Sequence, residues 1–77
     1  MNDAFMAEIH LDLMNITADW YVGNDISKYY PIMCKRIMEL NEWINTIPTE
    51  SRDAEPFHIL VEVCYQFYVF RDQACLK

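Results

Sequence analysis

The chain has 77 residues, of which 53% are hydrophobic and 14% aromatic, with one glycine and three prolines. A chain this rich in large apolar residues folds rather than staying disordered, and its length suffices for one domain with a core close to the minimum size. The net charge of -6 argues against direct binding to nucleic-acid phosphates, and no apolar run is long enough to span a membrane.

The first expected helix covers residues 3–22, with Asn2 and Asp3 as possible caps and Gly23 as a left-handed C-terminal cap. Spacings of three and four predict a core-facing stripe, which consists of Met6, Ile9, Leu13, Ile16 and Trp20. A second stripe, expected to contact another neighbour, consists of Ala7, Leu11, Met14, Ala18 and Tyr21. A polar row, expected on the far side of the helix, consists of Glu8, Asp12, Asn15 and Asp19.

A second helix is expected over residues 26–46, after a connection so short that the two helices must run antiparallel. Its apolar residues recur at alternating spacings of four and three, and they are Ile26, Tyr30, Met33, Ile37, Leu40, Ile44 and Ile47. Asp25 can cap its start. Pro31 would clash with the carbonyl of Ser27, which predicts either a bend near Pro31 or a separate first turn.

The third segment, residues 54–75, carries two competing patterns. Every odd position from Phe57 to Val69 is apolar, which is typical of a strand, but helical spacing also fits from Leu60 to Ala74. A single long strand without a partner would leave its backbone groups unpaired, so we predict a helix. The expected fold class is all-α: a compact antiparallel three-helix bundle, one domain over residues 1–77, that associates into a helical dimer.

The sequence contains few residues in patterns that are typical of a catalytic or metal-binding site. Glu39-x-x-Glu42 followed by Glu50-x-x-Asp53 resembles the magnesium-binding carboxylates of the all-α nucleotide pyrophosphohydrolases, but seven residues between the pairs are too few for the helical hairpin of those enzymes. There is no Glu-x-x-His pair, and three cysteines without metal spacing predict reduced, mostly buried thiols. We therefore expect no enzyme, catalytic residue, cofactor or metal. A metal- or nucleotide-dependent helical enzyme is the alternative, and a structural subunit of a larger assembly is a third.

Two surface features point to a protein partner. The acidic face formed by Glu8, Asp12, Asn15 and Asp19 can dock on a basic surface, although Lys28, Lys35 or Arg36 could instead neutralise it. Ten apolar residues remain beyond the three core stripes: Phe5, Leu11, Met14, Tyr21, Tyr29, Ile32, Trp43, Ile59, Tyr65 and Val69. Such a surplus predicts an interface, most simply a two-fold homodimer, and the expected binding residues are Leu11, Met14, Tyr21, Tyr29, Ile32, Trp43 and Tyr65. The alternative to an interface is a monomer with scattered exposed aromatic residues.

In size, acidity and lack of chemistry the chain resembles the accessory proteins that phages and mobile elements encode to bind and inhibit host machinery. The first residues lack the basic start and small-residue cleavage site of a secretory signal. The sequence therefore predicts a cytoplasmic inhibitor or adaptor, located in the host-cell cytoplasm if phage-encoded.

Overall fold

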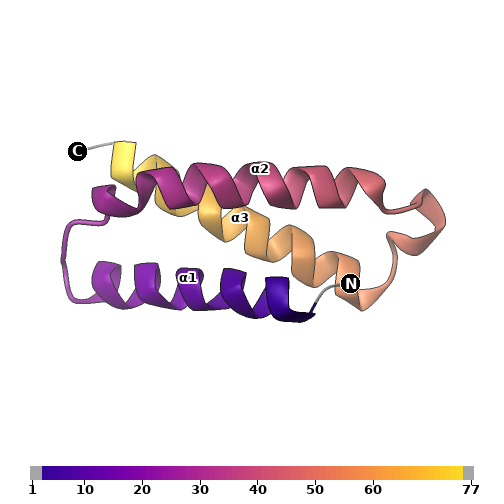
Figure 1. The fold of residues 1–77 in the computed structure, drawn as a ribbon, viewed down its shortest axis with the longest axis horizontal. Helices are drawn as coiled ribbons and strands as arrows, with labels where there is room; N and C mark the ends of the chain where they lie inside the picture. The colour runs from indigo at the N-terminus through magenta and orange to yellow at the C-terminus, as the bar shows by residue number, and fades with distance from the viewer. Residues whose placement is uncertain (1–2, 76–77) are drawn as a thin grey trace.

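The computed structural model describes residues 3–75 and contains three α-helices over that range (Figure 1). These are α1 (Asp3–Tyr21), α2 (Tyr30–Thr46) and α3 (Glu55–Cys75), with short 3-10 turns η1 (Ser27–Tyr29) and η2 (Thr49–Ser51) before α2 and α3. The all-α prediction is confirmed, and residues 57–70 are helical rather than a strand. The predicted cap Asn2 lies outside the described residues.

The end of α1 is set by Gly23, as its position in the sequence predicts. Gly23 has a φ of +84°, and its N–H donates to the carbonyl of Trp20 at 3.1 Å. The N–H of Asn24 donates to the carbonyl of Asp19 at 2.9 Å, which completes a Schellman motif. Asp25 then accepts a hydrogen bond of 3.0 Å from the N–H of Ser27, so the chain reverses within a few residues.

Pro31 lies directly after the junction between η1 and α2. It stands in the first turn of α2, where its missing N–H costs nothing because the first N–H groups of a helix have no partner inside the helix. Of the two predicted outcomes, the separate first turn is therefore the observed one. Ile26 is 1% exposed, so the segment before this turn is anchored in the core.

Helices α2 and α3 form the main packed pair, and α1 lies alongside them; consecutive helices are antiparallel, so α1 and α3 run in the same direction (Figure 1). The amide of Asn41 in α2 donates to the hydroxyl of Tyr68 in α3 at 2.8 Å. The buried apolar residues are Ile9, Ile16, Ile26, Met33, Ile37, Leu40, Leu60, Val63, Cys64, Phe67, Phe70 and Ala74. Only two of the core residues in the described range belong to α1, Ile9 and Ile16.

Aromatic contacts attach the two ends of α1. The ring of Phe5 lies 5.5 Å from that of Trp43 in α2, and the ring of Trp20 lies 5.9 Å from that of Phe70 in α3. Trp20 is nevertheless 49% exposed, so this member of the predicted core stripe lies at the rim of the core. No helix within residues 3–75 combines the length and the apolar character that crossing a membrane requires.

Candidate protein-binding surface

The acidic row of α1 borders α2, whereas the sequence pattern placed it on the far side of the helix. Arg36 of α2 donates from Nε to Asp12 at 2.7 Å and from Nη1 to Glu39 at 3.1 Å. Glu8 lies farther away, with 3.9 Å between its carboxylate and the guanidinium. The Arg36 side chain is only 11% exposed, and its guanidinium lies 5.6 Å from the ring of Phe5. Burial alone would lower the pKa of Arg36, but the hydrogen bonds and charges of Asp12 and Glu39 outweigh that effect and raise it.

Asp19, at the other end of the row, is held in the same way. Its carboxylate accepts hydrogen bonds from the hydroxyl of Tyr29 and, at 3.0 Å, from the amide of Asn24. The ammonium of Lys28 lies 3.5 Å away. These groups lower the pKa of Asp19, with the Tyr29 hydroxyl as the largest cause, and the same hydrogen bond raises the pKa of Tyr29.

The geometry of a helix explains why the row borders α2. Asp12 and Asp19 each follow a buried isoleucine by three residues, which places them about 60° around the helix from Ile9 and Ile16. Of the row, Glu8 and Asn15 are exposed. Lys28 and Arg36 thus provide the neutralisation that the sequence suggested as the alternative to a docking face.

The side of α1 that faces away from the core is apolar. We call it the outer face of α1, and it consists of Ala7, Leu11, Met14, Ala18 and Tyr21. Leu11 is 57% exposed, Met14 66% and Tyr21 83%. The prediction that this stripe packs on a second helix is wrong, because α1 reaches α2 and α3 through the core-facing stripe and its edges.

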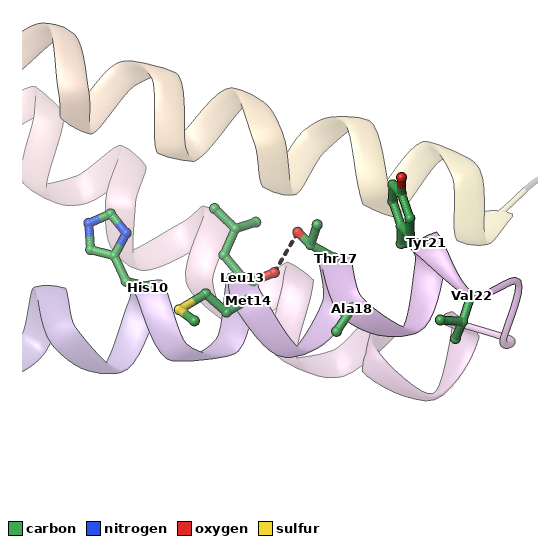
Figure 2. Close-up of a pocket in the computed structure, with 7 residues that line it drawn as sticks. All are labelled: His10, Leu13, Met14, Thr17, Ala18, Tyr21 and Val22. Atoms are coloured by element: carbon green, nitrogen blue, oxygen red, sulfur yellow. Dashed lines mark hydrogen bonds between the residues drawn. The ribbon is translucent and has the colours of Figure 1, made fainter.

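An open apolar hollow of about 560 Å³ runs along this region of α1 (Figure 2). It is lined by His10, Leu13, Met14, Thr17, Ala18, Tyr21 and Val22. In Figure 2, His10, Leu13 and Tyr21 extend from α1 on the side of α3. The hydroxyl of Thr17 donates to the carbonyl of Leu13 at 2.7 Å, so this polar group is satisfied inside the helix and the lining offers mainly apolar contact.

The other residues of the predicted apolar surface divide into two groups. Tyr29 and Trp43 are half-buried between α1 and α2, where Tyr29 bonds Asp19 and Trp43 packs on Phe5, so they are not open surface. Ile32 (37% exposed) and Tyr65 (62% exposed) lie on other helices. The exposed set that sequence reasoning missed is Trp20, Val22, Tyr30, Met38 and Val61. Periodicity alone could have identified Met38, because it lies well outside the apolar stripe of its helix.

Side chains that could bind a metal ion or take part in catalysis are dispersed over the described residues. Within residues 3–75, no three side chains of His, Cys, Asp or Glu are grouped to hold a metal ion. Glu39 is paired with Arg36, and Glu50 lies in η2. The three thiols were expected to be mostly buried, but only Cys64 is buried, while Cys34 is half-buried and Cys75 is exposed. Burial raises the pKa of the Cys64 thiol.

The sequence did not suggest any effect of the cysteines on Tyr30. The nearby thiols, Cys75 first and then Cys34, raise the pKa of the Tyr30 hydroxyl. Comparison of the chain with protein families, with curated proteins and with solved structures finds no match. On the part of the chain that the structure describes, the exposed apolar outer face of α1 is the candidate binding surface.

Proposed function

We propose that this chain is a non-enzymatic protein-binding module, an adaptor or inhibitor of cytoplasmic machinery, that docks through the outer face of α1. The observation that carries the proposal is the exposure of Leu11, Met14 and Tyr21 on one continuous face of a helix whose opposite face is buried. Covering such a face releases about 25 cal/mol per Å² of apolar surface. Exposed apolar faces rimmed by polar residues mark protein-interaction sites.

The residue types suit helix-mediated docking. Ala7 and Ala18 are small and let a partner backbone approach, while Leu11, Met14 and Tyr21 are large enough to fill pockets. Methionine adapts its shape to irregular surfaces. A homodimer is the simplest arrangement that covers the face, and a heterologous partner with a basic surface would be attracted by the net charge of -6.

Site-specific photo-crosslinking in the source cell tests the proposal. A photoreactive amino acid is placed at Met14 in one version of the chain and at Met38 in another, because these side chains are equally exposed, at 66% and 64%, on different helices. We expect a covalent protein adduct from position 14 and at most a tenth as much from position 38. Leu11→Glu should remove the adduct at position 14, with circular dichroism showing an unchanged helical fold.

Two results would reject docking through this face. One is equal adduct formation from positions 14 and 38, which would indicate random collision. The other is an adduct at position 14 that persists in full when Leu11→Glu is present, since a carboxylate in the middle of an apolar contact is left desolvated and unpaired.

A further inference from the structure

We infer that the occupant of the outer face of α1 is a second copy of this chain, with its α1 antiparallel to the first. This inference depends on the proposed function, because it uses the same docking face and takes the homodimer, rather than a heterologous partner, as the arrangement that covers it. It goes further in specifying which residues meet and in which direction the helices run.

The register follows from the spacing of the face. Ala7, Leu11, Met14 and Ala18 are separated by four, three and four residues, so their pattern reads the same in both directions about a point between residues 12 and 13. A two-fold axis at that point places Leu11 against Met14 of the second copy, and Ala7 against Ala18. Large side chains then meet large ones, and small side chains meet small ones. Tyr21 of each chain reaches the first turn of α1 in the other.

The charges of α1 permit this pairing. At one edge of the contact Glu8 comes near Asn15 of the second copy, and at the other edge His10 comes near Thr17, so no two carboxylates face each other. Asp12 and Asp19 are already paired on the α2 side. Antiparallel helices also place the positive end of one helix dipole beside the negative end of the other, whereas a parallel pair would place like ends together.

The area of the face indicates a weak, reversible dimer. A helix of 19 residues is roughly 28 Å long and about 10 Å across, so its outward half covers roughly 500 Å². Two copies therefore bury about 1000 Å², which is near the lower limit for a specific interface. We expect a dissociation constant of micromolar order or weaker.

The effect of ionic strength on binding distinguishes a second copy of this chain from a basic protein partner. Two copies that each carry a charge of -6 repel one another, so added salt should strengthen their association by screening the repulsion. Binding to a basic protein should respond in the opposite direction, because salt screens the attraction. Dimerisation that weakens as sodium chloride rises from 50 to 500 mM would contradict the apolar contact proposed here.

Sedimentation equilibrium of the full chain, from micromolar to millimolar concentration, tests the contact and its direction. Leu11→Lys and Met14→Glu should each weaken dimerisation by about 30-fold or more, because each places an unpaired charge at the centre of the apolar contact. Met38→Lys, which changes an equally exposed residue on α2, should leave it unchanged. Circular dichroism checks that every variant keeps its helices.

An equimolar mixture of the Leu11→Lys and Met14→Glu chains tests the register. Antiparallel pairing brings position 11 of one chain against position 14 of the other, so the opposite charges meet and the mixed dimer should recover to within about tenfold of the wild type. A mixture that stays as weak as its components would overturn the antiparallel register. A wild-type chain that remains monomeric at millimolar concentration would overturn the inference as a whole. If such a monomer still gives a photo-adduct with a different protein at position 14, the proposed function stands without it.

Discussion

Arg36 is the residue that ties α1 to α2. Its guanidinium contacts Asp12 across the helix boundary and Glu39 in its own helix, and it lies over the ring of Phe5. A charge that is 11% exposed has lost most of its hydration, so it is tolerated only because carboxylates replace the water. Arginine suits this position because its planar head can donate to two partners at once.

Arg36→Ala should lower the free energy of unfolding by about 2 kcal/mol, because it leaves two partly buried carboxylates without their cation. The value is discounted from that of a fully buried pair, since Asp12 and Glu39 are 24% and 31% exposed. Urea denaturation provides the measurement. Arg71→Ala is the control: Asp72 is 74% exposed and 3.9 Å from Arg71, and the Arg71 guanidinium lies 4.9 Å from the ring of Tyr68, so about 1 kcal/mol or less should be lost. Similar losses for the two variants would show that Arg36 does not secure α1.

At the scale of an element, the local sequence of α1 determines where the helix ends more clearly than it determines which face of the helix is buried. The Schellman motif at Gly23 ends the helix and directs the chain into η1, whereas two apolar stripes compete along its length. The helix uses one stripe for the core and leaves the other outside. The direction of α1 is thus fixed locally, while its rotation about its own axis is not.

Gly23→Ala should destabilise the protein by about 1 kcal/mol, because an alanine is strained at a φ of +84°. The loss should come from the backbone alone, as a Cβ at this position would have no neighbour within 4 Å. Gly23→Asn should lose less, since asparagine tolerates the left-handed conformation better. Thermal and urea unfolding of both variants measure the difference. An alanine variant as stable as the wild type would show that this turn can adopt another conformation.

At the scale of the whole molecule, the helices contribute unequally to the core. In the described range, α3 contributes six buried residues, whereas α1 contributes only Ile9 and Ile16. Separation of α1 from the α2–α3 pair therefore exposes less apolar surface than complete unfolding does. When α1 separates, Arg36 and its carboxylates regain their hydration. This hydration offsets part of the free energy that is lost with their ion pairs.

Hydrogen exchange should show this hierarchy. In dilute protein, the amides in the middle of α1 should exchange at least about tenfold faster than those in the middle of α2 and α3. If two copies pair through α1, raising the protein concentration should slow exchange in α1 selectively. Uniform protection of the three helices at every concentration would contradict the weaker attachment of α1.

The helices themselves, and their ends, were predictable from sequence because they depend on near neighbours. Spacings of three and four identified the helices, Gly23 marked the end of the first, and Pro31 marked the start of the second. The stripes that make the core of α2 and α3 were largely recognised. Met33, Ile37 and Leu40 of α2 are buried, and so are all five residues at the helical spacing of α3, namely Leu60, Val63, Phe67, Phe70 and Ala74. Tyr30 of the predicted α2 stripe is instead 41% exposed.

The side of α1 that is left open was decided by tertiary structure. Both of its apolar stripes satisfy helical periodicity, so the sequence predicted a contact for each: one stripe in the core, and the other on a neighbouring helix or a partner. The choice depends on residues far along the chain: Arg36 pairs with Asp12, and Lys28 with Tyr29 engages Asp19. These partners draw the acidic row against α2, and the helix geometry then leaves Leu11, Met14 and Tyr21 facing outward. Contacts between distant residues, which no local pattern encodes, thus created the candidate binding surface.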